Sequence, residues 1–440
     1  MLNTIKKIVI GFAQAFDQFA DKENLNPVSV KLLDYSPINI AGDSTRNHFI
    51  TFELSTRHRS HDFRLLFASK GLDDWHKIAT KNDCLVNFIR NYQFIGFKLS
   101  KINYNSKHRA LEVSLDRRTV LNSFFTTSNV KRDIVFAIYQ RFYDNQNSLT
   151  NERIGIVWKI LVRFLQNQNN HFQMIEGGLM NNLPEWCNNY VELLRTHSQN
   201  LIAHPSNGKY LICICHEQEY LKFEYAKNAL ENESYPINFI LIRIASIKNN
   251  DRSEYFNNIY KSIQDHDIEI ESDEYQTKLS SIIHLLSLFT SKLSTPVEIC
   301  SKNYVKLSVS LIYNINRIKK ILNIYDEKYN QISKSNENID YTVLCQDDDW
   351  FILWHHIRIY DQTISQLHES ILDNNGNFEP NRIIDQTRKL LHIFSVYYRN
   401  VKVLLEPYDH VYHLIRARIQ LCNQVLQRLL FFFNLANVNF

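Results

Sequence analysis

The sequence predicts an α/β chain followed by an all-α domain, and two observations carry this prediction. Apolar strand-like runs alternate with amphipathic helical segments up to about residue 300, after which helical periodicity continues alone. The chain has only 9 Gly and 8 Pro among 440 residues, too few for the many tight turns of sandwiches and barrels. We therefore expect three domains, over residues 1–130, 131–300 and 301–440.

Composition limits the class of protein. Hydrophobic residues make up 44% of the chain, enough for globular cores, and the net charge of +4 does not by itself indicate a nucleic-acid partner. The 7 Cys include no C-x-x-C, which favours reduced intracellular thiols over disulfides or a zinc site; Cys213 and Cys215 are expected in the core. No apolar run reaches the ~18 residues of a membrane span. We expect a cytoplasmic protein with no membrane contact, metal or cofactor.

The first 130 residues are predicted to mix one helix with strands. The helical spacing of Ile5, Ile8, Phe12, Phe16 and Phe19 indicates an amphipathic helix, not a signal peptide. The runs HFITFELS and ALEVSL alternate in polarity as strands do. This region is therefore expected to be α+β.

A basic cluster, STRHRSHDFR, separates these strand-like pieces. Its arginines are Arg57, Arg59 and Arg64. One interpretation is a solvated loop. The other is an arm that contacts phosphates, because clustered cations displace the counterions of a nucleic acid. The sequence leaves both interpretations open.

Residues 131–300 carry the pattern of a parallel sheet. The segment RIGIVWKILVRFLQ is helical in periodicity, and KYLICICHEQEYLKFEYAKNALE is an apolar strand that runs into a helix. Another apolar strand, INFILIRI, follows after a short connection. Strand, helix and strand in this order form a βαβ unit, so the two strands are expected to be parallel.

The last 140 residues are predicted to be helical. Asp347 to Asp349 precede Trp350, as suits the positive end of a helix. In the helix expected over 381–405, one stripe forms the seam of a helix bundle and places Tyr398 in the core and Tyr397 on an exposed flank. The helix is expected to end at Glu406, because Pro407 disfavours helical geometry there. The residues of the stripe are Ile384, Thr387, Leu391, Phe394, Tyr398, Val401 and Leu405.

The final helix has its own apolar seam, and Arg418 falls inside it. A buried guanidinium without a partner is too costly. We therefore predict that Arg418 pairs with a carboxylate or with carbonyls at a helix end. The seam residues are Val411, Ile415, Cys422, Val425, Leu429 and Phe432.

Positive charge is concentrated in these two helices. Residues 381–428 hold 8 Lys/Arg and 3 His against 3 Asp/Glu, an excess larger than that of the whole chain. One interpretation is a surface that faces RNA, which requires such a cluster of cations. The alternative is a helix flank that is only solvated. Tyr397 is the candidate for stacking on an unpaired base. The candidate cationic contacts are Arg388, His392, Arg399, Lys402 and Arg416.

The final helices resemble the DALR anticodon-binding domain of arginyl-tRNA synthetases. The segment from Tyr304 to Ile321 resembles the helix that opens this domain. Two glycines of the family pattern are replaced by Leu429 and Asn434; Asn434 is expected to cap the last helix, and Leu429 to lengthen or tighten it. The residues that carry the resemblance are Leu391, Phe394, Tyr397, Tyr398, Val403, Leu404, Arg418, Ile419, Leu421, Val425 and Leu426.

Upstream, ICICHEQEYLKF resembles the nucleotide-binding fold of a class I synthetase. The H-x-G-H element that such an enzyme needs is missing, and no K-M-S-K-S-type loop follows INFILIRI. QISKSN at 331–336 comes after the helix that opens the DALR domain and is interpreted as a coincidence. The resemblance therefore implies a degenerate class I synthetase-like fold followed by a DALR helical bundle.

A synthetase-like body without catalytic motifs, with TRHRSHDF before it and DDDWFILW after it, resembles the family of DALR anticodon-binding domain-containing protein 3. This resemblance implies a non-catalytic adaptor that recognises arginine tRNAs. The adaptor would present them to a partner tRNA cytosine-3 methyltransferase, which makes 3-methylcytidine in the anticodon loop. The alternatives are a divergent, ATP-dependent arginine–tRNA ligase and a protein-interaction scaffold.

Overall fold

The computed structural model divides the chain into two compact units, each built from three separate stretches of sequence. The first unit comprises Met1–Ser128, Tyr329–Asp361 and Tyr397–Leu421. The second comprises Asn129–Lys328, Gln362–Val396 and Cys422–Phe440. The predicted boundaries at residues 130 and 300 stay a prediction. The structure describes residues 2–23, 29–32, 49–54, 63–67, 74–75, 84–94, 97–107, 109–117, 134–140, 148–167, 174–175, 187–203, 208–248, 252–266, 272–298, 302–329, 339, 341–344, 346–372, 378–406, 408–438 and 440.

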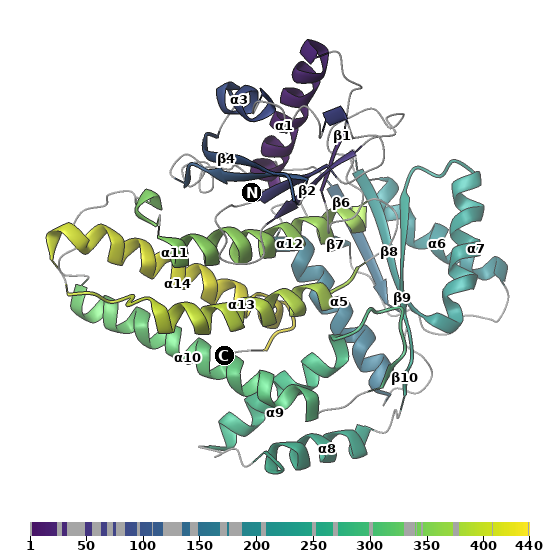
Figure 1. The fold of residues 1–440 in the computed structure, drawn as a ribbon. Coiled ribbons are helices and arrows are strands. Elements are labelled where there is room, and N and C mark those ends of the chain that lie inside the picture. The colour runs from purple at the N-terminus through teal and green to yellow at the C-terminus, as the bar shows by residue number, and fades with distance from the viewer. Residues whose placement is uncertain are drawn as a thin grey trace. The chain divides into compact units, whose positions relative to one another are not determined.

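The first unit contains a five-stranded sheet with two helices, α1 (Leu2–Glu23) and α3 (Cys84–Asn91) (Figure 1). The strand order is β1-β2-β3-β5-β4; β1 and β2 are parallel, and the other neighbours are antiparallel. The predicted first helix and the strands at HFITFELS and ALEVSL are confirmed. The strands are β1 (Ser29–Leu32), β2 (Phe49–Leu54), β3 (Phe63–Leu66), β4 (Leu99–Asn105) and β5 (Ala110–Leu115).

Aromatic side chains fill the core between α1 and this sheet. Phe12, Phe16 and Phe19, spaced along one face of α1, are buried as their spacing predicts. The ring of Phe16 meets the rings of Phe67 and Trp75 edge-on, at centroid distances of 6.0 and 5.7 Å. Such edge-to-face packing adds to the burial of apolar area.

The second unit contains a parallel sheet in the order β7-β6-β8-β9. Strand β8 (Gly208–His216) runs into α7 (Glu217–Asn232), and β9 (Asn238–Ile244) pairs with β8 in parallel, so the predicted βαβ unit is confirmed. The predicted helix at RIGIVWKILVRFLQ is α5 (Leu149–Asn167). The remaining elements are β6 (Ile134–Gln140), β7 (Met174–Ile175) and α6 (Cys187–Ile202).

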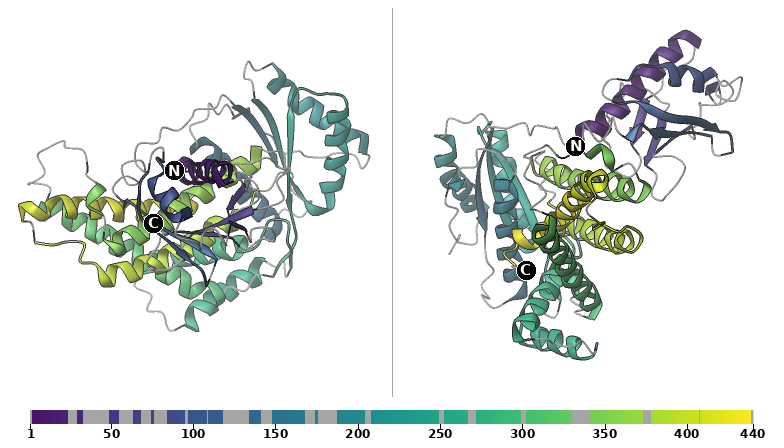
Figure 2. Two further views of the ribbon diagram at one scale, coloured as in Figure 1. Left: turned by 45° about the horizontal axis from the view of Figure 1, so that its top comes forward. Right: turned by 90° about the vertical axis from the view of Figure 1, so that its left-hand side faces the viewer.

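Both faces of this sheet are covered. Helices α6 and α7 lie on one face and α5 on the other (Figures 1 and 2). Along β8 the side chains alternate between the faces, and Leu211, Cys213 and Cys215 pack into one core cluster with α6 and α7. Burial raises the pKa of the Cys213 thiol to about 12. Cys213 and Cys215 are therefore core residues, as predicted.

Helices dominate the rest of the chain, and the predicted fold class, α/β followed by all-α, is confirmed. The segment 352–357 is a π-helix, in which hydrogen bonds join residues five apart. None of the helices in the described residues is long and apolar enough to cross a membrane. The elements are β10 (Ile247–Lys248), α8 (Arg252–Gln264), α9 (Asp273–Phe289), β11 (Val297–Glu298), α10 (Lys302–Tyr329), η1 (Tyr341–Val343), α11 (Asp347–Phe351), η2 (Ile352–Ile357), α12 (Arg358–Ser370), α13 (Asn381–Asn400) and α14 (Asp409–Leu435).

The C-terminal end of α14 differs from the expectation. The residue in the left-handed conformation is Asn437, with φ of 65°, not Asn434. The Val438 N–H donates to the Phe433 carbonyl at 2.9 Å, the six-residue bond typical of a Schellman cap. The helix continues through Leu429 to Leu435, so the residue that caps it is Asn437, three positions after Asn434.

Candidate functional site

Helix α13 carries four of the nine predicted contact residues, and the structure reverses the roles of its two tyrosines. Tyr397 is buried, with 3% of its surface exposed, whereas Tyr398 is 36% exposed. The prediction that Tyr397 is available for stacking and Tyr398 is in the core is therefore wrong. The buried seam runs through Ile383, Thr387, Leu390, Phe394, Tyr397 and Val401.

The burial of Tyr397 has a polar reason as well as an apolar one. Its hydroxyl donates a hydrogen bond of 2.8 Å to Oδ1 of Asp349, a carboxylate with no exposed surface. Asp349 lies in the first turn of α11, where the predicted helix N-terminus is confirmed. A buried carboxylate needs donors, and Tyr397 supplies one of them.

Arg418 supplies the compensating charge, as the sequence predicted. Its Nε donates to Asp349 Oδ1 at 3.1 Å and its Nη2 to Asp349 Oδ2 at 3.0 Å, a two-bond pairing of guanidinium and carboxylate. Nη2 also donates to the side-chain oxygen of Gln346, and only 4% of Arg418 is exposed. This geometry is the strong form of a charge-assisted hydrogen bond.

The same arginine fixes the chain after α13. Arg418 Nη1 donates to the backbone carbonyl of Lys402 at 3.3 Å, and the Tyr329 hydroxyl donates to the carbonyl of Leu405 at 2.8 Å. The side chains of Val401 and Val403 are buried below. Segment 401–406 is therefore held at its backbone while its polar side chains face outward.

These side-chain bonds explain why α13 ends earlier than predicted. The helix ends at Asn400, not at Glu406. Its last turn closes with the Val401 N–H donating to the Tyr397 carbonyl at 2.8 Å. Beyond that point, side chains of other elements bind the backbone carbonyls of Lys402 and Leu405. The helix therefore ends before Pro407, which lies outside the described residues, can have its local effect.

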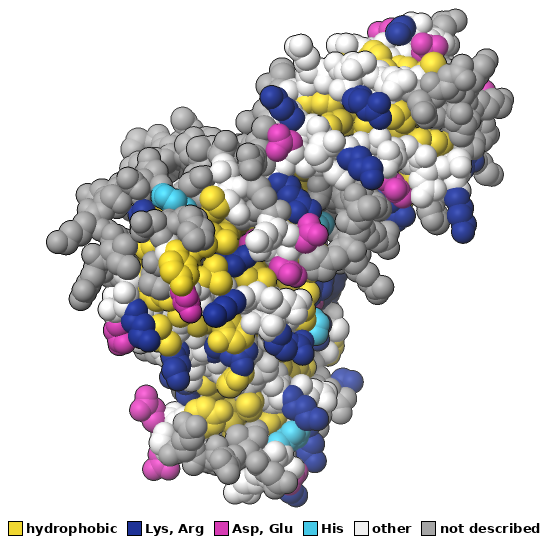
Figure 3. Space-filling view, turned by 60° about the vertical axis from the view of Figure 1, so that its left-hand side comes forward, with side chains coloured by type: hydrophobic (Ala, Val, Ile, Leu, Met, Phe, Trp, Pro, Cys, Tyr) yellow, Lys and Arg dark blue, Asp and Glu magenta, His cyan; other side chains and the backbone are white. Residues whose placement is uncertain are grey.

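Exposed cations and tyrosines surround the fixed segment. Arg399 and Lys402 are exposed, and Tyr408, which the sequence analysis missed, is 58% exposed. Arg416 on α14 is half-buried, and its charge opposes the rise in the pKa of Tyr341 that burial causes. Figure 3 shows a face of the molecule on which Lys and Arg side chains lie among hydrophobic ones. We call Tyr398, Arg399, Lys402, Tyr408 and Arg416 the 398–416 surface; all five belong to the first unit.

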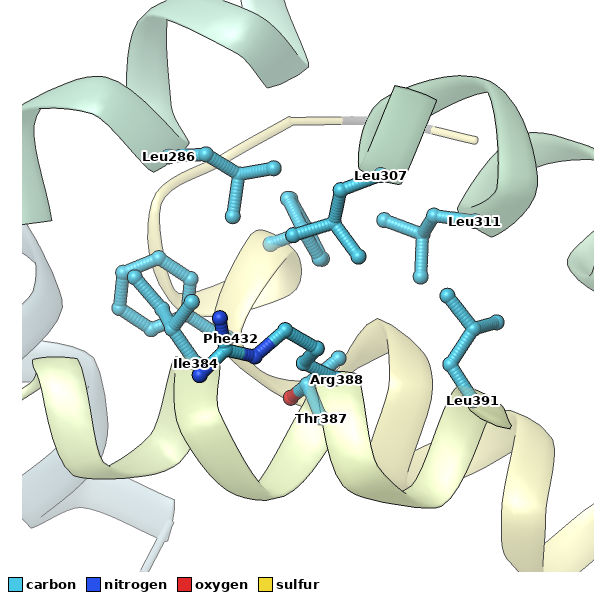
Figure 4. A pocket seen from close by; sticks show the side chains of 9 residues that line it. Leu286, Leu307, Leu311, Ile384, Thr387, Arg388, Leu391 and Phe432 are labelled. Atoms are coloured by element: carbon cyan, nitrogen blue, oxygen red, sulfur yellow. The ribbon is translucent and has the colours of Figure 1, made fainter. Parts of the chain in front are cut away.

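Two other predicted contacts, Arg388 and His392, lie earlier on α13, in the second unit. Both are exposed, and Arg388 forms an ion pair of 2.9 Å with Asp385. Its stem lies over a hollow among α9, α10, α13 and α14 (Figure 4). This hollow measures about 10 Å³, enough for roughly one water molecule and too small for a ligand. It is lined by Leu286, Leu307, Leu311, Ile384, Thr387, Arg388, Leu391, Phe432 and Phe433.

The basic cluster in the first unit is only partly described. Arg57 and Arg59 lie outside the described residues. Arg64 is in β3, so the interpretation of this position as part of a solvated loop is wrong, and its contact with phosphates stays a prediction. In the strand register Arg64 pairs with Glu53 on β2 and with Glu112 on β5. Both glutamates are on adjoining strands, outside the basic cluster, so the sequence of the cluster alone could not predict this pairing.

In the parallel sheet, the carboxyl ends of the strands are the usual place for a ligand. Here polar side chains bridge that edge internally. Glu217, which follows β8, accepts from the backbone N–H of Ser246 at 3.1 Å and from its hydroxyl at 2.7 Å. The Ile247 N–H donates to the Thr150 hydroxyl at 3.1 Å. These bonds join the start of α5 and α7 to the chain that leaves β9.

A buried arginine closes the same edge. Arg153 in α5 has no exposed surface and donates to the carbonyls of Ala245 at 3.4 Å and Lys292 at 3.2 Å. Burial lowers its pKa to about 10. After β9, β10 pairs with β11 in parallel, Ile247 with Val297 and Lys248 with Glu298.

The described residues contain no group of three or more His, Cys, Asp or Glu that could hold a metal ion. Glu152, His284 and Arg252 form a partly buried cluster: His284 Nε2 lies 3.1 Å from Glu152, and Arg252 Nε lies 3.5 Å from it. His284 Nδ1 lies 3.2 Å from the Tyr255 hydroxyl. The cluster joins α5, α8 and α9 and has the character of a structural network.

Comparisons with known proteins agree with this architecture. Residues 311–439 match the DALR anticodon binding domain family. An arginine–tRNA ligase of Borrelia hermsii is 30% identical over 122 residues, a match that covers 28% of this chain and 18% of that protein.

Two solved structures share the fold over most of the chain. The arginyl-tRNA synthetase of Plasmodium falciparum has a TM-score of 0.55 at 12% identity, covering 90% of this chain and 95% of that one. The arginyl-tRNA synthetase of Thermus thermophilus has a TM-score of 0.53 at 8% identity, covering 98% and 99%. The chain therefore has the fold of the class I arginyl-tRNA synthetases, with a DALR anticodon binding domain at residues 311–439.

Proposed function

We propose that the chain is a non-catalytic adaptor that binds arginine tRNAs. The observation that carries this proposal is the 398–416 surface, which lies within the DALR match and is held by the buried Asp349–Arg418 pair. Arg399 and Lys402 would neutralise phosphates, the source of affinity in most RNA complexes. Tyr398 and Tyr408, with exposed rings, would stack on unpaired bases of the anticodon loop.

The non-catalytic part of the proposal rests on the edge of the parallel sheet. Thr150, Arg153 and Glu217 hydrogen-bond to the protein's own backbone there, where a class I enzyme would hold ATP. The sequence offers neither an H-x-G-H element nor a K-M-S-K-S-type loop. We infer that this edge binds no ATP and serves as a scaffold.

The finer part of the proposal is the destination of the bound tRNA. The sequence resembles the family of DALR anticodon-binding domain-containing protein 3 and has no glycine loop of the kind that binds S-adenosylmethionine. We therefore infer that a partner tRNA cytosine-3 methyltransferase makes 3-methylcytidine in the anticodon loop, in the cytoplasm. Purification of the chain under RNA-preserving conditions should enrich arginine tRNAs together with such a methyltransferase. Recovery of no tRNA, even at low salt, would rule out the adaptor.

A charge-reversal pair tests the 398–416 surface. Arg399→Glu/Lys402→Glu should weaken tRNA binding at least about tenfold, because two phosphate contacts become repulsive. Lys248→Glu/Lys261→Glu is the matched control, since both lysines are exposed, lie outside the DALR match and give the same change in net charge. Equal affinities of the two double variants would exclude this surface.

A divergent arginine–tRNA ligase is the second candidate, favoured by a shared fold over 90% of the chain. An aminoacylation assay with ATP, arginine and an arginine tRNA separates the two candidates. We expect no charging above the enzyme-free background. Charging that depends on both ATP and arginine would replace the adaptor with an enzyme.

A further inference from the structure

Helix α10 carries a second concentration of positive charge, outside the surfaces described above. From Lys302 to Tyr325 the helix holds 5 Lys/Arg and no Asp or Glu. This excess is larger than the net charge of +4 of the whole chain. Asp326 and Glu327 follow in the last turn of α10, so the run without acidic residues ends at Tyr325. Such a cluster of cations along a helix is the electrostatic footprint of a polyanion partner.

Two of these cations bind groups outside α10. Lys302 forms an ion pair of 3.4 Å with Asp265, and the Lys319 ammonium donates to the carbonyl of Phe440 at 2.9 Å. Lys306, Arg317 and Lys320 remain on the solvent side, with Lys306 and Lys320 exposed.

These side chains share one face with an exposed tyrosine. Residues 306, 313, 317 and 320 are spaced by seven, four and three, the spacing of one helix face. Leu307 and Leu311 point from α10 into the hollow of Figure 4, so this face is turned away from the helix packing. The line extends about 21 Å along the helix, from the rise of about 1.5 Å per residue.

At the centre of the line, Arg317 stacks on Tyr313. The guanidinium carbon lies 4.4 Å from the centroid of the tyrosine ring, and the guanidinium also donates a hydrogen bond to the Tyr313 hydroxyl. Tyr313 is 58% exposed. The pair therefore presents a flat, positively charged surface to solvent, held in place before any ligand arrives.

We propose that this face, the α10 stripe of Lys306, Tyr313, Arg317 and Lys320, binds single-stranded RNA. Unpaired bases stack on aromatic rings and on guanidinium planes, so one base rests on the Tyr313–Arg317 pair. The lysines on either side bind the flanking phosphates. Each nucleotide of a single strand brings both a flat base for the stacked pair and a phosphate for a lysine, whereas the carboxylates of an acidic protein would engage the lysines alone. The inference rests on the proposed tRNA binding and adds a contact site in the second unit.

Point variants separate stacking from charge. Dissociation constants for an arginine tRNA and for a single-stranded RNA oligonucleotide would be measured by fluorescence anisotropy over a range of salt. Tyr313→Ala should weaken both complexes about tenfold with little change in salt dependence, because a base-stacking surface is lost. Arg317→Lys keeps the charge but removes the plane and should weaken binding several-fold.

The lysines have a different expected signature. Lys306→Ala/Lys320→Ala should reduce the slope of log affinity against log salt by about 1.4, from about 0.7 per phosphate contact in single strands. Tyr225→Ala is the matched control, because Tyr225 is also 58% exposed but lies on α7, where Glu outnumbers Lys. It should bind as the unaltered protein does. Circular dichroism melting of each variant verifies folding.

The outcomes distinguish this inference from the proposed function. If the unaltered protein binds tRNA, but Tyr313→Ala and Lys306→Ala/Lys320→Ala bind equally well, the α10 stripe is overturned and the adaptor stands. The stripe is likewise overturned if these variants lose only an acidic protein partner. If the unaltered protein binds no RNA at any salt concentration, the stripe and the adaptor fail together.

Discussion

The substitution Arg418→Met is expected to lower the free energy of unfolding by about 3–5 kcal/mol, the usual cost of leaving one member of a buried ion pair alone. Asp349 has no exposed surface and takes two of its hydrogen bonds from Arg418. Met fills a similar volume, so the loss is electrostatic, not a cavity. The carbonyl of Lys402 and the side chain of Gln346 lose a donor as well.

Urea unfolding followed by tryptophan fluorescence measures this loss close to its source. Trp350 follows Asp349 directly and stacks on Trp354 with ring centroids 5.2 Å apart. Arg416→Met is the matched control, because Arg416 is only half-buried and belongs to the same helix; its effect should stay below about 1 kcal/mol. The double variant Asp349→Leu/Arg418→Met should recover part of the stability, since no charge is then left buried.

Equal unfolding midpoints for Arg418→Met and Arg416→Met would refute the reasoning. The Asp349–Arg418 pair would then contribute no more than a surface contact. The account of how segment 401–406 is held would fail with it.

Three further outcomes are expected. Tyr397→Phe should cost about 1.5–3 kcal/mol in urea unfolding, because its hydroxyl bonds a charged, buried group; a loss below about 0.5 kcal/mol would contradict this. Burial acts to raise the pKa of Glu152, but the hydrogen bond and charge of His284 and the charges of Arg252 and Lys159 together outweigh it, so the pKa is lowered. The stability from Glu152 is thus present above its ordinary pKa of 4.5 and lost as pH falls through the lower folded value. The difference in free energy of unfolding between the unaltered protein and Glu152→Gln should shrink below about pH 5. A difference that does not change with pH would contradict the lowered pKa of Glu152. In alkylation with iodoacetamide at about pH 8 followed by mass spectrometry, exposed Cys84 should react and buried Cys213, with its pKa of about 12, should react only after unfolding.

Local patterns predicted the elements whose signals are local. The strand at 208–216, the helix after it and the parallel strand at 238–244 follow from apolar runs and a short connection. The buried face of α1 follows from the spacing of its phenylalanines. The buried position of Arg418 followed in the same way, because it interrupts an apolar seam.

The two tyrosines of α13 show where such patterns become ambiguous. A seam through Tyr398 and a seam through Tyr397 both alternate steps of three and four, and they share Thr387, Phe394 and Val401. Periodicity alone cannot choose between them. The choice depends on Asp349, which is 48 residues away in the chain and binds the Tyr397 hydroxyl.

The end of α13 and the surroundings of Arg64 were missed for a related reason. Bonds to the carbonyls of Lys402 and Leu405 come from Arg418 and Tyr329, residues that are distant in sequence. Glu53 and Glu112 become neighbours of Arg64 only once the strands are paired. Tertiary partners, invisible to a local window, decide these features.

The partition of the first unit into three stretches of sequence has a consequence for biosynthesis. Asp349 and Arg418 are 69 residues apart, and at translation rates of about 5–20 residues per second roughly 3–14 s pass between them on the ribosome. During that interval the carboxylate has no guanidinium and must remain hydrated. The last stretch of the unit ends at Leu421, so a nascent chain stopped before that residue cannot complete a unit that begins at Met1. Premature stop codons anywhere between Tyr397 and Leu421 should therefore yield chains that chaperones and proteases recognise as unfinished.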